Sequence, residues 1–135
     1  MATWLEHLSD DQARERLSTA VLGRIAVMVD GHPEIFPVNH VYDSTLGVAF
    51  PTNDRTKLHA ALEWPWISFE VDGIEESGDA GWSVLVVGHA REVDDPAVRE
   101  DLASRRSVKW ATSSNLRWLH IEPTKITGRR ISYAL

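Results

Sequence analysis

Strand-like patterns of apolar residues dominate the chain. Residues 66–72 (WISFEVD) alternate strictly, with Ile67, Phe69 and Val71 on one face and polar side chains on the other, as in a half-buried strand. Other apolar runs are rich in β-branched residues and are bounded by turn residues, which is also typical of strands. The strands expected on this basis are residues 22–29, 34–42, 46–50, 66–72, 82–93, 116–123 and 125–132.

Short helices are expected where the strand pattern breaks. Ser9 and Gln12 have the spacing of a capping box, so the first helix should begin directly after Ser9. A second helix is expected over residues 56–63, and a third after Asp95, where a proline stands at the first helical position. Residues 104–115 read as the end of that helix followed by a loop.

The order of these elements predicts the fold class. Asp30-Gly31 is a strong signal for a hairpin turn, and Pro37 places the returning strand at an edge or a bulge. Six or seven strands follow one another in hairpins, without the strand–helix–strand rhythm of a parallel sheet. We therefore expect a mainly β protein, an antiparallel barrel with a few short helices.

Two of the runs, VLGRIAVMV and WSVLVVG, are apolar on both faces. An antiparallel sheet with one solvated face would instead alternate cleanly. The outside of the barrel must therefore be covered, in part by the helices and for the rest by a homodimer interface.

Composition narrows the classes of function. The 135 residues suit one domain, residues 1–135, and the formal net charge of -6 argues against nucleic-acid or anionic-membrane surfaces. No cysteine is present, which excludes disulfides, zinc–thiolate sites and cysteine nucleophiles. The first residues carry acids and no long apolar run, and no stretch approaches the roughly 20 apolar residues of a membrane span. A cytoplasmic protein is expected.

The usual catalytic motifs are missing. There is no glycine-rich nucleotide fingerprint, and GWSVL lacks the final glycine of a serine nucleophile elbow. The histidines do not stand at helical ligand spacing, so no metal site is predicted, and His40 and His89 are interpreted as structural. Glu70 is interpreted as a solvated outward position, with pairing to Arg24 as the alternative.

The segment TNDRTK, residues 52–57, places hydroxyl and charged groups where an expected strand ends and the next helix begins. A helix N-terminus offers unpaired N–H groups that bind phosphate well. Thr52 and Thr56 add hydroxyls and Arg55 and Lys57 add cationic donors, whereas Asp54 suits the N-cap. From the residues alone, both a helix cap and an anion site remain open.

Five stretches of the chain, in order, resemble a known family. They run from about Gly23 to Ser132 and read GRIAVMVDGHPEIFPVNHVYD, FPTNDRTKL, SFEVDGI, GWSVLVVGHAREV and IEPTKITGRRIS. They are similar to the pyridoxamine 5'-phosphate oxidase-like flavin-binding split barrels, especially the small actinobacterial-type members. The resemblance implies a split barrel of the FMN-binding type and a homodimer, with one flavin in each of two sites at the dimer interface.

The same resemblance implies site residues. In such proteins the strand matching PVN follows the isoalloxazine ring, the strand-to-helix segment holds the phosphate, and the strand matching GWS also reaches the flavin. A basic residue near the C-terminus comes from the partner subunit. The cofactor-binding residues implied here are Val38, Asn39, Thr52, Arg55, Thr56, Lys57, Trp82, Ser83 and Arg129.

The resemblance also implies an activity, an FMN-dependent oxidoreductase that acts on a small electron-poor substrate with NAD(P)H as a possible donor. The chain lacks the C-terminal arginine- and histidine-containing segment of pyridoxamine-phosphate oxidases proper, so vitamin B6 oxidation is not expected. The alternatives are a non-catalytic flavin, deazaflavin or haem protein, with His40 or His89 as axial ligand for haem, and a dimer that has lost its ligand.

Overall fold

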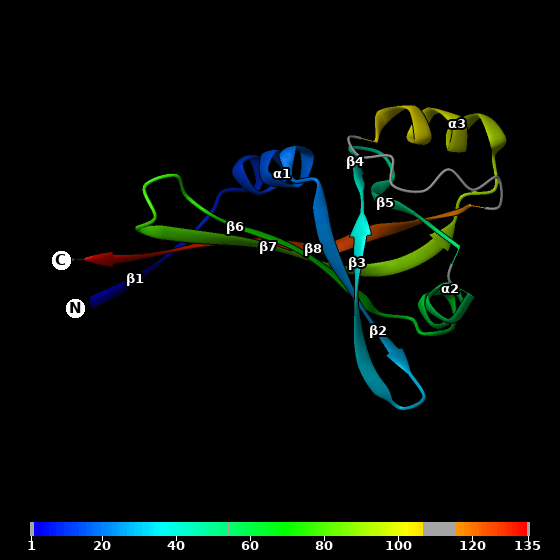
Figure 1. Cartoon of the computed structure of the whole chain (residues 1–135), viewed down its shortest axis with the longest axis horizontal. Helices are drawn as coiled ribbons and strands as arrows, with labels where there is room; N and C mark the ends of the chain where they lie inside the picture. The colour runs from blue at the N-terminus through cyan, green and yellow to red at the C-terminus, as the bar shows by residue number, and fades with distance from the viewer. Residues whose placement is uncertain (1, 54, 107–115, 135) are drawn as a thin grey trace.

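The chain folds into a strongly curved antiparallel sheet with short helices packed against it (Figure 1). This computed structural model describes residues 2–53, 55–106 and 116–134. Within them the strands follow the order β3-β2-β6-β7-β8-β5-β4, and β1 pairs with β8. The elements are β1 (Ala2–His7), α1 (Asp10–Thr19), β2 (Leu22–Val29), β3 (His32–Asn39), β4 (Val41–Asp43), β5 (Gly47–Thr52), α2 (Arg55–Glu63), β6 (Ile67–Ile74), β7 (Ala80–Glu92), α3 (Pro96–Arg105) and β8 (Arg117–Ala134).

The expected mainly β, antiparallel barrel class is confirmed, and so are its local signals. Asp30 and Gly31 both have positive φ, 50° and 83°, as a two-residue hairpin turn requires. The Ser9 hydroxyl accepts from the Gln12 N–H at 3.2 Å, and the Gln12 side chain accepts from the Ser9 N–H at 2.9 Å, which completes the capping box. Asp95 caps α3 by accepting from the Ala97 N–H at 2.9 Å.

The long-range arrangement differs from the expected series of hairpins. The two strands expected at the end of the sequence form one strand, β8, which pairs with β7 along most of its length. Pro123, where a break was expected, instead faces Gly88 at a β-bulge, which accommodates a residue without an N–H. In the part of the chain that the structure describes, the sheet has eight strands rather than six or seven, since β1 and the short β4 were not expected as separate strands.

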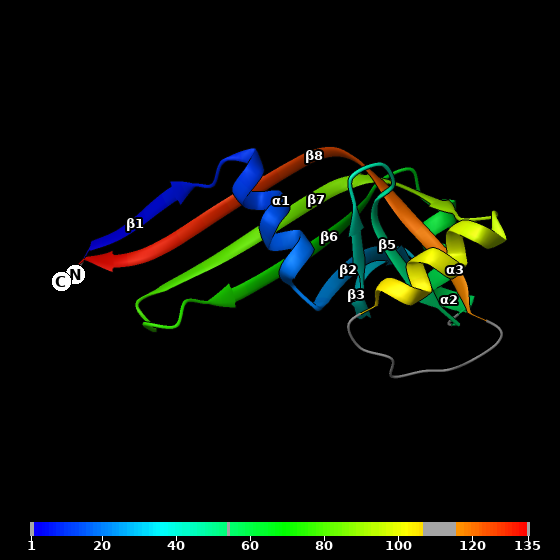
Figure 2. The same ribbon diagram turned by 90° about the horizontal axis from the view of Figure 1, so that it is seen from above.

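The sheet has two differently built halves. At one end β2, β3, β4 and β5 curl around a core, and at the other end β1 and the ends of β6, β7 and β8 extend as an arm (Figures 1 and 2). Helix α1 lies across one face of the arm, where a Cβ at Gly128 of β8 would be 3.2 Å from the Ala13 side chain of the helix and 2.9 Å from the Leu8 side chain that precedes it. We call the opposite face of the sheet the lower face.

Two apolar clusters hold the barrel half together. The main cluster fills the barrel and includes Ile25, Val48, Phe50, Phe69, Val71, Val84, Val86, Leu119 and Ile121, with Leu17 of α1 and Ala60 and Ala61 of α2. The smaller cluster lies under α3 and contains Val41, Ala49, Val93, Leu102 and Trp118. Strand β5 contributes to both clusters, so α3 covers the outer face of this strand.

Candidate functional site

The TNDRTK segment joins the end of β5 to the start of α2. Thr52 and Lys57 are buried, whereas Arg55 and Thr56 are exposed at the first turn of the helix. The first N–H groups of a helix have no intrahelical partner and carry a partial positive charge. Asp54 lies outside the described residues, so its role as N-cap remains a prediction.

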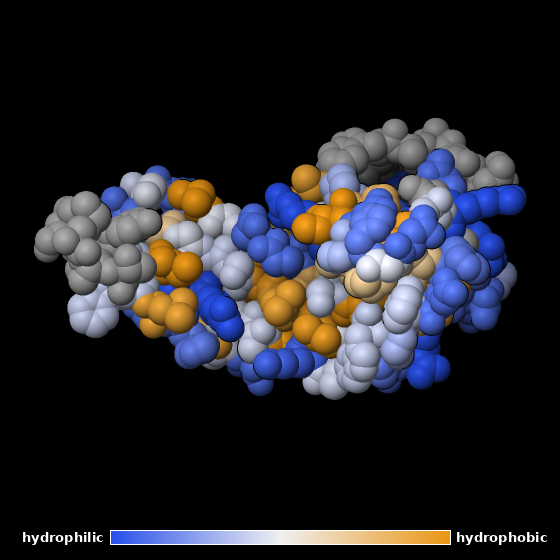
Figure 3. Space-filling view, turned by 90° about the horizontal axis from the view of Figure 1, so that it is seen from below, coloured by the Kyte–Doolittle hydropathy of each residue, from blue (hydrophilic) through white to orange (hydrophobic). Residues whose placement is uncertain are grey.

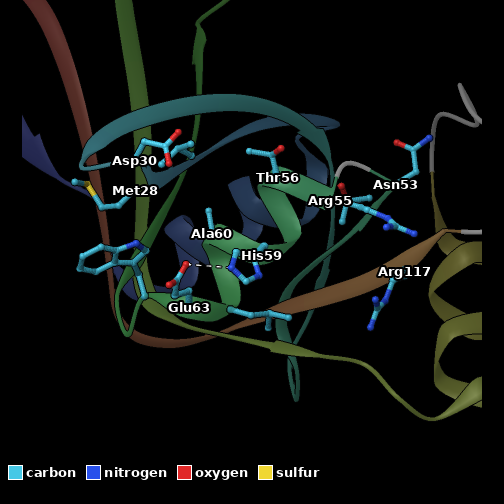
Figure 4. Close-up of a pocket in the computed structure, with 13 residues that line it drawn as sticks. Met28, Asp30, Asn53, Arg55, Thr56, His59, Ala60, Glu63 and Arg117 are labelled. Atoms are coloured by element: carbon cyan, nitrogen blue, oxygen red, sulfur yellow. Dashed lines mark ion pairs between the residues drawn. The ribbon is translucent and has the colours of Figure 1, made fainter.

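A groove of about 1360 Å³ runs along α2, and we call it the α2 groove. Figure 4 shows Asn53, Arg55 and Arg117 grouped at its cationic end, with Met28 and Asp30 at the other end. Between them His59 and Glu63 form an ion pair of 3.3 Å. The remaining lining residues are Val29, Thr52, Thr56, Ala60, Leu62 and Trp64.

Arg117 was not predicted as a site residue. It enters the groove because β8 pairs with β5, which places Arg117 opposite Thr52. Its guanidinium also donates to the Glu92 carboxylate from Nε at 2.8 Å, so part of its charge is compensated. Only the pairing of two strands far apart in sequence reveals this residue, and no local motif could have found it.

Lys57 connects the TNDRTK segment to β3. Its side chain is only 9% exposed, and its Nζ lies 5.6 Å from the centre of the Phe36 ring. Phe36 belongs to the same strand as Val38 and Asn39, the two predicted ring contacts. The structure therefore brings one predicted phosphate-binding residue next to the strand predicted to contact the ring.

Strand β3 offers unused polar groups. It is the end strand of the sheet and pairs only with β2 among the described residues. Val38 is buried in the barrel core, and the Asn39 amide donates to the Val21 carbonyl at 2.8 Å. The Asn39 Oδ1 atom is buried with no hydrogen-bond partner in the described part of the chain, so it is an acceptor available to a ligand.

The other predicted residues gather at the far end of the sheet. Trp82, Ser83 and Arg129 line a hollow of about 390 Å³ on the arm, which we call the arm hollow. Ser83 and Arg129 are direct partners in the β7–β8 ladder, whereas the Trp82 ring packs under Arg16 of α1, 4.5 Å from its Cζ. The separation from Arg117 to Arg129 along β8 is on the order of 40 Å. Within one chain the arm hollow is therefore remote from Arg117 and the cationic end of the α2 groove.

The two histidines considered as haem ligands have other contacts. His40 is buried, its Nε2 lies 2.9 Å from the Leu17 carbonyl, and its ring packs edge-on against Phe69. Burial lowers the pKa of His40, and the bond to Leu17 opposes that shift. The His89 ring lies 4.3 Å from the Trp66 ring. Among the described residues no group of three or more acidic or histidine side chains could hold a metal.

Two carboxylates, Glu70 and Asp72, lie together on the lower face, and the sequence had indicated only the pairing of Glu70 with Arg24. Arg24 Nη1 lies 3.6 Å from Glu70 Oε1 and 3.5 Å from Asp72 Oδ1, which confirms the alternative of a Glu70–Arg24 pairing. Burial and the neighbouring Asp72 carboxylate raise the pKa of Glu70 to about 7. Two acids two positions apart on one strand share a face, so the sequence carried this signal in Glu70 and Asp72.

Comparisons with known proteins support the family. A family model described as pyridoxamine 5'-phosphate oxidase matches residues 9–130. An uncharacterized protein of Mycobacterium tuberculosis is 30% identical over 135 residues, covering 92% of this chain and 84% of that protein. Among the described residues, no helix is long and apolar enough to cross a membrane.

Solved structures share the same fold. The FAD binding protein from Mycobacterium smegmatis is 34% identical, with a TM-score of 0.79 over 96% of this chain and 100% of that one. A FAD-binding protein from Mesorhizobium loti is 21% identical and has a TM-score of 0.82 over 98% and 100% of the two chains, a likeness that concerns the fold alone. Sequence, fold and the family model agree, and the chain belongs to the pyridoxamine 5'-phosphate oxidase family.

Proposed function

We propose that the chain binds a flavin nucleotide, FMN in the first place, with the phosphate at the TNDRTK segment and the ring along β3. The observation that carries this proposal is the contact of Lys57 with Phe36, which joins the anion-binding residues to the predicted ring strand. The buried, unpartnered Asn39 Oδ1 on the same strand supports it.

The phosphate site is formed by a helix start and two cationic side chains. Hydroxyl and charged donors come from Thr52, Arg55, Thr56 and Lys57. The first N–H groups of α2 point out of the N-terminal end of the helix, where an anion binds. Lys57 is held in place by its burial, so it loses little side-chain entropy when it binds an anion.

The ring site uses backbone groups at a sheet edge. The pyrimidine edge of a flavin carries carbonyls and an N–H group, which are complementary to the N–H and C=O groups of an unpaired strand edge. Strand β3 has such an edge, and Asn39 Oδ1 adds an acceptor. Val38 lies beside these groups with its side chain fixed in the core, which keeps the strand rigid.

We further propose that a second copy of the chain completes each site. We expect the arm hollow, lined by Trp82, Ser83 and Arg129, to serve the flavin site of the partner copy rather than the site of its own chain. In a homodimer whose two sheets pack face to face and run in opposite directions, the arm of one copy reaches the barrel of the other. Arg129 then adds a cationic donor beside the cofactor.

The activity proposed is that of an oxidoreductase acting on a small electron-poor molecule such as a quinone or a nitroaromatic compound, with NAD(P)H as donor. A bound flavin supplies hydride or single-electron transfer. The residues of the chain bind the phosphate, orient the ring and hold its pyrimidine edge by hydrogen bonds. None of the named side chains is required to act as a general acid or base.

FAD is a second candidate for the cofactor. The relative from Mycobacterium smegmatis is an FAD binding protein, and the α2 groove continues from Arg55 past His59 to Trp64. Helix α2 has nine residues, and its length of about 13 Å gives room for a second phosphate and an adenosine. The Trp64 side chain, 45% exposed, offers a surface on which adenine can stack.

Titration of the ligand-free protein with FMN and with FAD, followed by flavin fluorescence, tests the binding proposal. We expect saturable binding of at least one of them and oxidised flavin bands in the visible spectrum of the loaded protein. A protein that binds neither would contradict the proposal. Turnover of a quinone with NAD(P)H by the loaded protein separates the oxidoreductase from a non-catalytic carrier, and a strong Soret band after purification would indicate haem instead.

The variant Trp64→Ala separates the two flavins. If adenine stacks on the indole, FAD binding should weaken by about 0.5–1.5 kcal/mol, up to about tenfold, because an aromatic contact is lost. FMN binding should not change. Equal affinities of wild type and variant for FAD would place the adenosine elsewhere, and Trp66→Ala, at another exposed tryptophan, serves as the control.

A further inference from the structure

The lower face of the sheet exposes several large apolar side chains. Figure 3 shows this face, with orange apolar groups lying between charged ones. Successive residues of a strand point to opposite faces, and the register of the sheet places one set of apolar side chains on this side. The exposed members are Leu5, Leu22, Ile35, Ile74, Leu85 and Ile131, of which Ile74 and Ile35 are 75% and 69% exposed. Large exposed apolar patches of this kind mark interaction surfaces.

The same face has features that fit a second copy of itself. The arm hollow opens here over Gly81, between Ile74 and Ile131, and Ile35 protrudes elsewhere on the face. Asp72 and Arg129 flank Ser83 in one row across the sheet, so both signs of charge are present. In a two-fold contact a residue i of one copy meets a residue j of the other, and the reverse. A surface that carries both a hollow and a protrusion, and both an acid and a base, therefore has the elements that such a self-facing contact needs.

An acidic cluster lies within this apolar surface. Glu70 is opposite Arg24 on β2 and opposite Leu85 on β7. Its Oε1 atom is buried without a hydrogen-bond partner in the described residues, because the Arg24 Nη1 atom, at 3.6 Å, is too distant for a good hydrogen bond. A carboxylate that is already poorly solvated would lose its remaining water if the face were covered.

The charges that face Glu70 come from its own strand and from β2. Asp72 shares the Arg24 guanidinium with it and repels its ionised form. Strand β7 presents Leu85 and Ser83 on this side, and β3 presents Pro37 opposite Arg24. On β8 the nearest cationic groups of this face are Arg129 and Lys125, which lie in the neighbouring rows of the ladder. One arginine thus serves two carboxylates, and a proton on one of them removes the excess charge.

We propose that two copies of the chain associate through the lower face and that Glu70 must bind a proton for tight association. The dimer then strengthens as the solution becomes more acidic. This inference rests on the proposed homodimer and adds a regulatory property to its interface.

The direction of the pH dependence of association follows from burial of the Glu70 carboxyl group. In the free chain the pKa of Glu70 is about 7, and covering the face raises the pKa further because the charged form loses solvent. The dimer therefore binds more protons than two free chains above pH 7. Its dissociation constant should be constant below about pH 7 and should rise above it, by at most about a hundredfold per pH unit since two Glu70 groups are involved.

Sedimentation velocity of the full chain at graded concentrations, at pH 6.5 and 8.5 and constant ionic strength, tests the proposal. We expect the dissociation constant of the wild type to be at least about tenfold larger at pH 8.5. The variant Glu70→Gln, which mimics the protonated acid, should remain tightly associated at both pH values. Glu100→Gln, an exposed position on α3, should behave as the wild type.

Each other outcome overturns the proposal in a distinguishable way. A chain that is monomeric at every pH would remove the homodimer as well. A dimer with the same dissociation constant at both pH values, including one that never dissociates measurably at nanomolar concentrations of labelled protein, would remove only the role of Glu70. A Glu70→Gln variant as pH-dependent as the wild type would also remove it. None of these measurements requires bound flavin, so the binding proposal is tested separately.

Discussion

Folded proteins usually bury apolar side chains and expose polar ones, and the two ends of the sheet break this rule in opposite ways. At the barrel end polar side chains are buried, among them Asn39, Thr52 and Lys57. At the arm end apolar side chains are exposed, among them Ile74 and Ile131. Buried polar groups and exposed apolar patches are the informative exceptions in a folded protein. The difference indicates that the barrel end is prepared for a polar ligand, whereas the arm, together with Leu22 and Ile35 on the lower face, is prepared for a protein surface.

The largest expected effect tests whether the barrel end alone carries the stability of the fold. Phe69 is fully buried in the main cluster, so Phe69→Ala should lower the free energy of unfolding by about 3–5 kcal/mol. Ile131→Ala on the exposed arm should cost well under half of that. Urea denaturation at a protein concentration that keeps the chain monomeric measures both. Equal losses would show that the arm is as much a part of the stabilising core as the barrel.

The next effect concerns the ligand end. Lys57→Met keeps the packing on Phe36 and removes the charge, so FMN binding should weaken by about 1–3 kcal/mol, or roughly 5- to 150-fold. Lys125→Met removes the same charge from an exposed position on β8 and should leave the FMN dissociation constant unchanged. Calorimetric titration gives the constants, and thermal melting checks that both variants are folded. If both variants bind FMN like the wild type, the phosphate lies elsewhere.

A change in the arm hollow tests the protein-binding end. A Cβ at Gly81 would be 3.5 Å from the Gly73 carbonyl oxygen and 3.6 Å from Ile74 Cδ1, which are ordinary contacts, so Gly81→Val should fold. The larger side chain fills the hollow, and we expect the dissociation constant of the homodimer to rise about tenfold, or 1.4 kcal/mol. Gly81→Ala is the matched control with a smaller effect. Unchanged association of the valine variant would mean that the hollow is outside the interface.

The smallest effect concerns the pH dependence of the monomer. The pKa of Glu70 in the folded chain, about 7, is above the ordinary value of 4.5, so between these values the folded state binds more protons than the unfolded state. The contribution of Glu70 to stability is therefore fully present below about pH 4.5 and is lost as the pH rises through 7. Glu70→Gln should gain stability relative to the wild type between pH 5 and pH 8 in urea denaturation. A constant difference between the two proteins would contradict this assignment.

Local features of the fold could be predicted from the sequence because their causes are local. The Asp30-Gly31 turn and the Ser9–Gln12 capping box depend on neighbouring residues, and the structure confirms both. The continuity of β8 through Pro123 could not be predicted, because the bulge depends on the partner strand and on the space beside Gly88. Strand β1 was missed for the same reason, since a short segment without strict alternation becomes a strand only by pairing with β8.

The candidate site divides in the same way. The TNDRTK segment was recognisable because a strand, a turn and a helix start follow one another in the chain. The contribution of Arg117 depends on the pairing of β5 with β8, and the grouping of Ser83 with Arg129 depends on the pairing of β7 with β8. The sequence named both members of the second pair through the family resemblance, but only the structure places them on one face.

The prolines of β3 have a consequence for the behaviour of the protein at high concentration. Pro33 and Pro37 lie in the strand opposite Met28 and Arg24, and a proline is tolerated there only if its nitrogen faces away from β2. The open edge therefore lacks N–H donors at two of its outward positions and is a poor template for another strand. Edges without such protection promote aggregation. The edge of β3 can stay open for a small molecule while resisting the edge-to-edge addition of further strands that leads to fibres.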